Sequence, residues 1–469
     1  MNTNIPIRRA LVSVYDKTGV LELAQLLQKF GVEIISTGGT YKLLADSGVP
    51  VIKVSEITRF PEILGGRVKT LHPHIHGGIL AKRTTEQLAE LAQHDITPID
   101  LVVVNLYPFE KTVAAPDVTL EQALENIDIG GPTMIRAAAK NYPAVTVVTD
   151  PSQYDELAAE LTANNGAVTP VLRQKFALAA FTRTSAYDQA ISAFLAGLEA
   201  PATALPERVN LNLVKVQNLR YGENPHQRAA FYADALKTPS GAAAAKQLHG
   251  KELSYNNIMD MSAAIGLALE FEGPAVAIIK HSNPCGVAVA DDVATAYERA
   301  LSTDSTSAFG GIVAANREVT KAAAERIAEI FTEVVVAPAF SQEAIDILRQ
   351  KKNVRLILWP SAKSPQSGLE IKAVEGGYLL QDMDLAPTNW QDWKVVSKRK
   401  PSDAEWNAMK FGWKVAKWVK SNAVVYVNET QTLGVGAGQM SRVDSSKLAV
   451  SKAAEAGLSL KGSVVVSDA

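Results

Sequence analysis

The sequence predicts an α/β protein, in which a parallel sheet covered by helices is followed by further α/β subdomains. Short apolar runs alternate with amphipathic stretches through the first 200 residues. Such runs between turn signals are typical of buried strands, and the amphipathic stretches are typical of surface helices. Repeated strand–helix–strand units favour a parallel sheet. A chain of 469 residues is too long for one ordinary core, so the length predicts about three domains.

The first domain is predicted to alternate strands and helices up to a boundary rich in proline. Its elements in chain order are strand 9–16, helix 17–31, strand 32–37, a glycine turn with a helix over 38–48, and strands 100–109 and 144–150. The stretch 196–210 has two prolines and no apolar periodicity. We interpret it as the boundary between domains 1–200 and 201–469.

The second domain repeats the α/β pattern and is predicted to divide near residue 360, at the loop 359–368. Its expected strands are 275–281, 310–316, 333–340, 354–359, two within 423–438 and a last one within 462–469, with a helix from about Asp444. The last strand ends in small and acidic residues. Strands of this kind usually lead into another element, so we expect further residues beyond it and an incomplete last subdomain.

Composition excludes several classes of partner. The chain has 47 lysines and arginines against 49 aspartates and glutamates, a net charge of −2. No basic field therefore attracts nucleic acid or an anionic membrane. No secretory signal pattern opens the chain, and no apolar run approaches the roughly 20 residues that span a bilayer. A single cysteine cannot form an intrachain disulfide, which fits a reducing cytoplasm. We expect a soluble cytoplasmic protein.

A glycine turn in the first domain is a candidate phosphate site. The stretch STGGT (36–40) places Thr37, Gly39 and Thr40 between a strand and the start of a helix. Free N–H groups and hydroxyls at such a position suit a phosphate. The alternative is an ordinary tight turn between a strand and a helix.

The stretch LGGRVKTLHPHIHGG (64–78) combines basic groups with three histidines. Arg67, Lys69 and Thr70 follow a flexible glycine pair. Histidines at positions 72, 74 and 76 suggest a metal site, because alternate residues share one face of a strand. Pro73 and the flanking glycines interrupt a regular strand, however, and no carboxylate cluster follows. We expect no metal here.

Polar groups also follow two other predicted elements of this domain. Asn105 and Tyr107 lie at the end of a strand, and Asp128 precedes a Gly-Gly-Pro helix start, with Lys140 about three turns later. Each of them alone is compatible with a capped helix or a solvated side chain. Because several such groups follow the carboxyl ends of strands, where α/β proteins bind their ligands, we interpret them together as a binding or catalytic site.

Two polar loops mark the second domain. LRYGENPHQ (219–227) carries Arg220 and Tyr221, for which solvated loop residues are the alternative. GVGAGQMSR (434–442) carries Gln439 and Arg442. Its glycines lack the spacing and the ribose-binding acid of a dinucleotide fingerprint, so we exclude that type of site.

The only cysteine lies in IIKHSNPCG (278–286). A zinc nucleoside deaminase would show H-x-E and P-C-x-x-C, but here Asn283 and Ala288 occupy the required positions and no second cysteine exists. Cys285 is therefore either a small buried residue or a nucleophile. The neighbouring pair Lys280–His281 is the better candidate, because histidine exchanges protons near neutral pH and an ammonium stabilises an oxyanion.

Nine motifs in one order resemble the bifunctional family that joins phosphoribosylaminoimidazolecarboxamide (AICAR) formyltransferase to IMP cyclohydrolase. They cover essentially the whole chain: SVYDKTG, STGGT, LGGRVKTLHPHIHGGIL, NLYPF, IDIGGPTMIRAAAKN, LRYGENPHQ, KHSNPCG, SAFGGIVAAN and GVGAGQMSR. The resemblance implies a methylglyoxal synthase-like first domain and two cytidine deaminase-like subdomains without zinc. It also implies a homodimer with formyltransferase sites between subunits.

The resemblance further implies the reactions and their residues. A formyl group would move from 10-formyltetrahydrofolate to AICAR, and formyl-AICAR would then close to IMP with loss of water, without a redox cofactor. The catalytic residues would be Lys69, Tyr107, Asp128 and Lys140 for ring closure, and Lys280 and His281 for formyl transfer. The substrate-binding residues would be Asp16, Lys17, Thr18, Thr37, Gly39, Thr40, Arg67 and Thr70 in the first domain, and Arg220, Tyr221, Gln439 and Arg442 in the second. Some family members hold a structural potassium ion, so the resemblance also allows a potassium site in this chain.

Two alternatives to a fully bifunctional enzyme remain, and the first depends on the C-terminal end of the chain. The family continues past the strand ending in SDA with a phenylalanine-rich segment and a basic, aromatic C-terminus that contribute to the folate and AICAR sites. We therefore expect cyclohydrolase activity with weak or no formyl transfer, and the alternative is a cyclohydrolase whose second half is a dimerisation scaffold. A non-catalytic nucleotide sensor is the other class, against which the retained Lys, His, Asp and Tyr groups argue.

Overall fold

The structure is a computed structural model that describes residues 3–199, 205–235, 239–360, 368–386 and 388–468. The chain divides into two units, Met1–Asn212 and Leu213–Ala469, so the border lies just beyond the predicted boundary stretch. Residues 200–204 of that stretch, and residues 361–367 of the predicted subdomain loop, lie outside the described residues. None of the described helices is long and apolar enough to cross a membrane.

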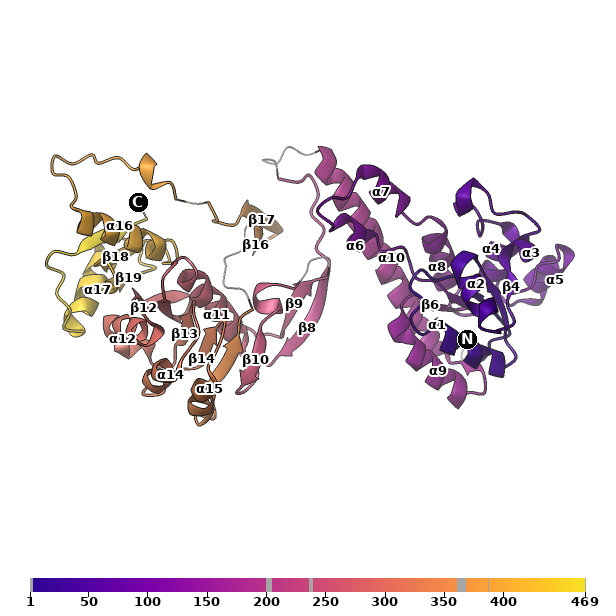
Figure 1. The fold of residues 1–469 in the computed structure, drawn as a ribbon, viewed down its shortest axis with the longest axis horizontal. Coiled ribbons are helices and arrows are strands. Elements are labelled where there is room, and N and C mark those ends of the chain that lie inside the picture. The colour runs from indigo at the N-terminus through magenta and orange to yellow at the C-terminus, as the bar shows by residue number, and fades with distance from the viewer. Residues whose placement is uncertain (1–2, 200–204, 236–238, 361–367, 387, 469) are drawn as a thin grey trace. The chain divides into compact units, whose positions relative to one another are not determined.

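The first unit contains a parallel sheet, as predicted, surrounded by helices (Figure 1). Its five strands follow the order β4-β3-β2-β5-β6, and the short β4 was not predicted. Its strands are β2 (Arg9–Val12), β3 (Glu33–Ser36), β4 (Ile52–Lys53), β5 (Leu101–Val103) and β6 (Thr146–Val148). A separate antiparallel pair consists of β1 (Ile5–Pro6) and β7 (Ala167–Val168). The paired strands are shorter than the apolar runs that predicted them, because each run continues into the loop that leaves the sheet.

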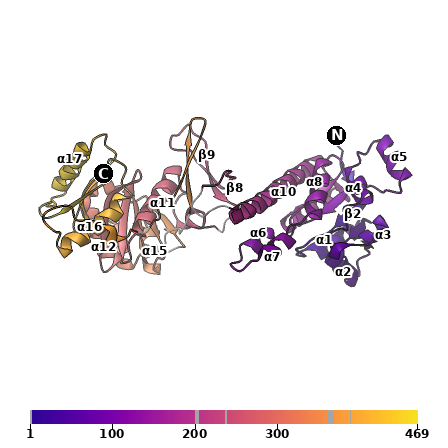
Figure 2. The same ribbon diagram turned by 90° about the horizontal axis from the view of Figure 1, so that it is seen from above.

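Helices cover both faces of this sheet. They are α1 (Val20–Lys29), α2 (Gly38–Asp46), α3 (Val54–Thr58), α4 (Pro73–Leu80), α5 (Thr85–Gln93), α6 (Phe109–Val113), α7 (Leu120–Glu125), α8 (Gly130–Lys140), α9 (Tyr154–Ala163) and α10 (Pro170–Glu199), with 3₁₀ turns η1 (Leu64–Gly66) and η2 (Pro151–Gln153). Leu11 of β2 joins the core under α3, α4 and α8, whereas Ala10 and Val12 join the core under α1 and α9. Alternate strand residues therefore bury both faces of the sheet. The long helix α10 runs beside α8 (Figures 1 and 2).

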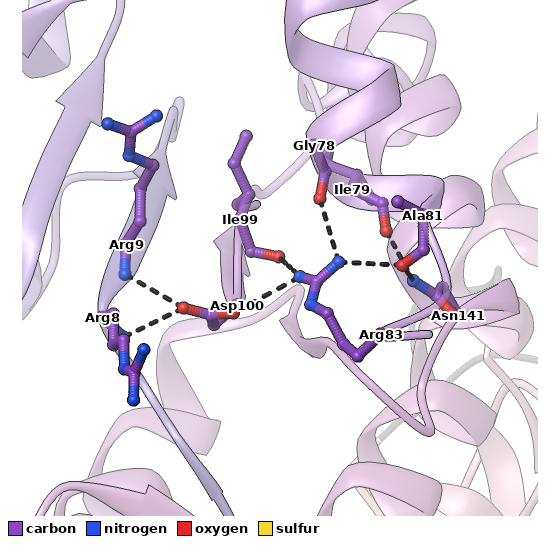
Figure 3. Close-up of polar contacts among 9 residues, drawn as sticks. All are labelled: Arg8, Arg9, Gly78, Ile79, Ala81, Arg83, Ile99, Asp100 and Asn141. Carbon is purple, nitrogen blue, oxygen red and sulfur yellow. Dashed lines mark hydrogen bonds and ion pairs between the residues drawn. The ribbon is translucent and has the colours of Figure 1, made fainter. Parts of the chain in front are cut away.

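A polar network fastens the amino edge of this sheet (Figure 3). The Asp100 carboxylate accepts hydrogen bonds from the backbone N–H groups of Arg8 and Arg9, at 3.0 and 3.2 Å. The Arg83 guanidinium donates to the carbonyls of Ala81 and Ile99, at 2.8 and 2.7 Å, and contacts Asp100 Oδ1 at 3.3 Å. Because these partners come from different elements, the network joins the end of α4 to the start of β2 and β5.

The second unit contains a six-stranded mixed sheet in the order β10-β15-β14-β13-β11-β12. Its strands are β10 (Lys246–His249), β11 (Ala275–Lys280), β12 (Asn283–Val289), β13 (Ile312–Ala315), β14 (Val334–Ala337) and β15 (Arg355–Leu358). The helices are α11 (Tyr255–Ala268), α12 (Val293–Thr303), α13 (Ser305–Ala308), α14 (Lys321–Ile327), α15 (Gln342–Arg349), α16 (Asp403–Ala416) and α17 (Arg442–Glu455), with 3₁₀ turns η3 (Gly241–Ala243) and η4 (Trp390–Asp392). Helices α11 and α16 share one core with the sheet, and α12, α14 and α15 share the other.

Smaller sheets complete the second unit. A three-stranded sheet has the order β19-β18-β20, and two hairpins stand apart. These strands are β8 (Leu213–Leu219), β9 (Ala229–Asp234), β16 (Leu369–Val374), β17 (Gly377–Asp382), β18 (Val424–Val427), β19 (Thr432–Gly436) and β20 (Val464–Ser467). The predicted glycine loop thus begins inside β19. A Cβ atom on Gly436 would overlap the Ser445 carbonyl oxygen, so glycine lets α17 approach the strand.

Aromatic residues cluster around α16. The Trp393 ring lies 4.9 Å from Trp390, 6.0 Å from Trp406 and 5.2 Å from Trp413, measured between ring centroids. All six tryptophans of the chain lie between residues 359 and 418, within the second unit.

Candidate active sites

The carboxyl ends of the parallel strands meet at one edge of the first unit, as they must when all strands run the same way. The Asn105 side chain, just after β5, organises the loop that follows β2. Its Oδ1 accepts hydrogen bonds from the N–H groups of Tyr15 and Asp16, at 2.6 and 3.0 Å. Its Nδ2 donates to the Asp16 carbonyl at 3.0 Å. Two loops far apart in the sequence are thereby held together.

Several predicted binding residues lie between this loop and the start of α2. The Lys17 ammonium donates to the Val14 carbonyl and to Thr40 Oγ1, the latter at 3.0 Å. The Thr37 hydroxyl lies 2.7 Å from Ser13 Oγ. Thr37 and Thr40 are both buried, so their hydroxyls connect the two loops.

Two ammonium groups gather at the start of α2. A Cβ atom on Gly38 would lie 3.8 Å from Lys69 Nζ. The pKa of Lys17 is lowered, first by burial and then by the charge of Lys69. Gly39 is exposed in the first turn, where backbone N–H groups have no partner within the helix. Two cations and a helix N-terminus together suit an anion such as a phosphate.

Asp128 lies beside Lys69 and Tyr107. Its Oδ1 accepts a hydrogen bond from the Gly131 N–H at 2.8 Å. Burial raises the pKa of Asp128, and Gly131, Lys69 and the Tyr107 backbone only partly oppose this effect. The pKa of Tyr107 is raised by burial and then by the charge of Asp128. A carboxyl group, a phenol and an ammonium therefore interact electrostatically, which is a suitable set for moving a proton and stabilising an oxyanion.

Helix α10 supplies a support for Asp128 that the sequence did not suggest. The buried Tyr187 hydroxyl accepts a hydrogen bond from the Asp128 N–H at 2.9 Å and donates to the Asn126 carbonyl at 2.8 Å. The loop before α8 is therefore fixed from a helix 59 residues away. No local motif marks such a partner. Ser13 and Tyr15, by contrast, lie within three residues of the predicted Asp16, in the same SVYDKTG motif.

The remaining predicted residues of the first unit have varied surroundings. Asp16 Oδ1 accepts hydrogen bonds from the N–H and hydroxyl of Thr18, at 2.9 and 2.7 Å, and these bonds lower the pKa of Asp16. Thr70 is buried, with its hydroxyl 3.1 Å from where a Cβ atom on Gly130 would lie. Arg67 forms an exposed ion pair with Glu125.

Lys140 lies away from the other predicted catalytic residues. It is exposed at the end of the 11-residue helix α8, on the order of 15 Å along the axis from the helix start beside Asp128. The next residue, Asn141, donates to the Ile79 and Ala81 carbonyls at the amino edge of the sheet (Figure 3). The structure therefore does not bring Lys140 to the Asp128 group within this unit.

His74 and His76 lie on α4 and His72 is its N-cap residue, so none of the three histidines lies on a strand. His72 caps that helix by accepting from the His74 N–H at 3.2 Å, and His74 Nδ1 lies 2.8 Å from the Ile57 carbonyl oxygen. Burial lowers the pKa of His76. Within the described ranges, no group of three or more His, Cys, Asp or Glu side chains is placed to hold a metal ion.

In the second unit, Lys280 and His281 lie where β11 turns into β12. Lys280 pairs with Asn283 across the hairpin, and its ammonium donates to the Phe309 carbonyl at 2.8 Å. Asn283 donates to the His281 carbonyl at 3.1 Å and accepts from the Lys420 N–H at 3.0 Å. Asn422, two residues further, donates to the Gln439 carbonyl at 2.8 Å. Predicted residues Lys280, His281 and Gln439 thus belong to one set of connected loops.

Cys285 is a buried core residue. Burial raises the pKa of its thiol to about 12, so it is a poor nucleophile at neutral pH. Of the two interpretations of this cysteine, the structure favours the small buried residue.

The predicted AICAR-binding residues of the second unit occupy two places. Arg442 donates from Nε to Ser467 Oγ at 2.9 Å and from Nη2 to Asp468 Oδ1 at 3.1 Å. Arg220 lies over the Tyr221 ring, 5.6 Å from its centroid. In the part of the chain that the structure describes, no hydrogen bond or ion pair joins Arg220 or Tyr221 to Lys280 or His281.

Two family models match this chain, and their matches meet between residues 133 and 138, within the first unit. The sequence model of an MGS-like domain matches residues 19–133, and that of the AICARFT/IMPCHase bienzyme matches residues 138–452. The bifunctional purine biosynthesis protein PurH of Neisseria meningitidis serogroup C is 53% identical over 472 residues, covering 99% of this chain and 90% of that protein. The protein of the same name from Neisseria gonorrhoeae has the same identity and coverage.

A solved structure described as the crystal structure of ForH is 36% identical, with a TM-score of 0.36, and covers 40% of this chain and 99% of that one. The family match extends over most of the chain, and the PurH relatives match nearly all of it. The chain belongs to the AICARFT/IMPCHase bienzyme family, with an MGS-like domain at its N-terminal end.

Proposed function

We propose that the chain catalyses the last two steps of IMP synthesis, formyl transfer to AICAR and cyclisation of formyl-AICAR. The observation that carries this proposal is the 53% identity to bifunctional PurH proteins over 99% of the chain. A cyclohydrolase alone is not favoured, because the bienzyme match continues to residue 452 and includes Lys280, His281 and Arg442. A nucleotide sensor without turnover is disfavoured for the same reason.

For cyclisation, we assign the reacting groups to Lys69, Tyr107 and Asp128. The carboxamide nitrogen of formyl-AICAR attacks the formyl carbon, a proton leaves that nitrogen, and water is finally lost. Asp128 is the candidate base, because burial holds its pKa above the ordinary value and so makes it a stronger proton acceptor. Lys69 is the candidate for stabilising the developing oxyanion. Holding the two reacting ends together supplies much of the acceleration.

The phosphate of this substrate is assigned to the start of α2. Lys17 and Lys69 supply two positive charges there, and the helix supplies N–H groups. Asp16, Thr18, Thr37, Gly39, Thr40, Arg67 and Thr70 remain proposed binding residues. Lys140 remains a prediction that the arrangement of this unit does not support.

For formyl transfer, His281 is assigned as the base and Lys280 as the stabilising cation. The AICAR amine attacks the formyl carbon of 10-formyltetrahydrofolate, its proton passes to His281, and the bond from the formyl carbon to the folate nitrogen breaks. Lys280 stabilises the charge on the formyl oxygen or on the leaving nitrogen. Arg220, Tyr221, Gln439 and Arg442 are proposed to hold AICAR through its phosphate and carboxamide.

Other assignments follow from the same family. We infer a homodimer, in keeping with apolar side chains of β8 such as Leu213, Val214 and Val216 that stay about half exposed. We infer a cytoplasmic enzyme, in keeping with a single cysteine. A potassium ion remains a prediction.

Separate assays of the two reactions test the proposal. The chain is mixed with AICAR and 10-formyltetrahydrofolate, and formyl-AICAR and IMP are both measured. In a second assay the chain is mixed with formyl-AICAR and IMP is measured. We expect IMP in both assays, in place of the weak or absent formyl transfer expected from the sequence alone, because the PurH relatives match nearly the whole chain. His281→Ala should abolish only the first reaction and Lys69→Ala should slow only the second. IMP from formyl-AICAR alone would instead identify a cyclohydrolase without formyl transfer.

A further inference from the structure

The turn that carries His281 is the shortest that joins two antiparallel strands. Lys280 and Asn283 form the last pair of the β11–β12 hairpin, so its loop consists of His281 and Ser282 alone. Both residues have positive φ angles, 52° and 58°. Two-residue loops with positive φ at both positions are type I′ turns, which strongly favour Asn-Gly. His and Ser carry a Cβ atom, which makes positive φ angles energetically unfavourable for both residues.

Asp260, in the middle of α11, stabilises this turn through hydrogen bonds to its backbone. Its Oδ2 accepts a hydrogen bond from the His281 N–H at 3.1 Å, and its Oδ1 accepts one from the Ser282 N–H at 2.8 Å. Oδ1 also accepts from the Ser282 hydroxyl at 3.1 Å. One carboxylate therefore binds both amides of the loop, and hydrogen bonds to a charged acceptor are the stronger kind.

A second contact fixes the other side of the turn. Asn283 donates to the His281 carbonyl and is itself bound to the Lys420 N–H. The backbone of His281 is thus held at its N–H and at its carbonyl, while its side chain stays exposed. This arrangement leaves the imidazole available to a substrate but gives its backbone little freedom.

We propose that Asp260 is a positioning residue for formyl transfer, because it holds the left-handed His281–Ser282 turn that presents the base. The inference rests on the proposed function of His281. It assigns Asp260 no contact with substrate, so its loss should lower kcat and leave the KM for AICAR nearly unchanged. Glycine at position 282 should adopt the turn without this support.

The test compares Asp260→Ala, Ser282→Gly and their combination in the full chain. We expect Asp260→Ala to lower the kcat of formyl transfer by about 10- to 100-fold, because small misplacements of a reacting group have effects of this size. Ser282→Gly alone should have little effect, and the double variant should regain most of the lost kcat. Cyclohydrolase activity in the same chain should not change.

Two controls separate the possible causes. Asp292→Ala removes another carboxylate that binds a backbone N–H in this unit, that of Thr295 at 2.9 Å, and should leave kcat unchanged. Asp260→Asn keeps one acceptor oxygen. It replaces Asp260→Ala in the test if that variant does not fold. Formyl transfer that survives in His281→Ala would overturn the proposed function itself.

Three results would contradict the positioning role of Asp260. An unchanged kcat in both Asp260 variants, with His281→Ala inactive, would overturn it. A raised KM for AICAR at constant kcat would overturn it in favour of a substrate contact. A double variant no faster than Asp260→Ala would also overturn it, because the turn would not be the cause of the loss.

Discussion

At the scale of single residues, burial decides which titratable groups can react. Asp128 is held with a pKa above the ordinary Asp value of 3.8, chiefly by burial. A base must be ionised to act, so the cyclisation rate should fall as the pH drops through this raised pKa. The acid limb of the pH profile should therefore lie above that of an ordinary aspartate. An acid limb at or below pH 3.8 would contradict the assignment.

The same shift predicts that Asp128 weakens the folded state. Where the folded pKa exceeds the unfolded one, the group's stabilising contribution is complete below the unfolded pKa and is lost as the pH rises through the folded pKa. Asp128→Asn should thus stabilise the first unit at neutral pH while lowering the cyclisation kcat by about 10²-fold or more. Slower hydrogen exchange in β2 and β5 would report the stabilisation, and formyl transfer is the control for activity.

Cys285 illustrates the opposite case, a reactive residue type made inert by its surroundings. Because burial raises its pKa to about 12, hardly any thiolate exists at neutral pH. Cys285→Ala should leave both activities within about twofold of the parent chain. A thiol reagent should modify the folded chain slowly and the unfolded chain at once. Rapid labelling that stops formyl transfer would refute this expectation.

At the scale of elements, Arg83 joins the end of α4 to the start of β5. Arg83→Ala would leave the Ala81 and Ile99 carbonyls and the buried Asp100 carboxylate without this donor. We expect the first unit to lose about 2–4 kcal/mol of stability. Denaturant titration followed by cyclohydrolase activity measures the loss. Lys175→Ala removes only an exposed pair with Glu156 and should change stability by less than about 0.5 kcal/mol.

The contact between α17 and β19 depends on glycine. Gly436→Ala should force the helix away from the strand at a cost of about 1–3 kcal/mol or more, and should reduce formyl transfer because Gln439 and Arg442 lie next to this contact. Gly273→Ala is the matched control, since nothing lies within 4 Å of its added methyl group. Equal effects of the two substitutions would contradict the packing explanation.

At the scale of the whole molecule, each unit has its own cores. One pair of apolar clusters belongs to the first unit and the other pair to the second. We therefore expect the two activities to disappear at different denaturant concentrations. Arg83→Ala should shift only the loss of cyclisation, and Gly436→Ala only the loss of formyl transfer. Coincident shifts in both variants would show that the units unfold together.

The sequence predicted the fold more fully than the sites. Apolar runs located β2, β3, β5, β6, β11, β13, β14, β15, β18, β19 and β20. They missed the short β4, the edge strands β10 and β12 and the two hairpins. The common direction of the strands in the first unit placed Lys17, Thr37, Tyr107 and Asp128 at one edge of that sheet. Tyr187 and Asp260 escaped detection because each supports a loop from a helix packed against it, and packing leaves no local pattern. Lys140 was grouped with Asp128 by its motif, although a helix of 11 residues separates the two. The strand that ends at His281 was predicted, but neither the hairpin with β12 nor the left-handed conformation of His281 and Ser282 was.

The cluster of tryptophans around α16 provides the molecule with a built-in spectroscopic label. All six indoles lie in the second unit and none in the first. Fluorescence excited at wavelengths that only tryptophan absorbs therefore comes from the second unit, to which formyl transfer is proposed to belong, and not from the first. A single tryptophan introduced at an exposed site of the first unit, such as Leu178→Trp on α10, would give that part a signal of its own. Energy transfer from it to an acceptor dye on the other unit would then measure the distance between the two active parts during turnover.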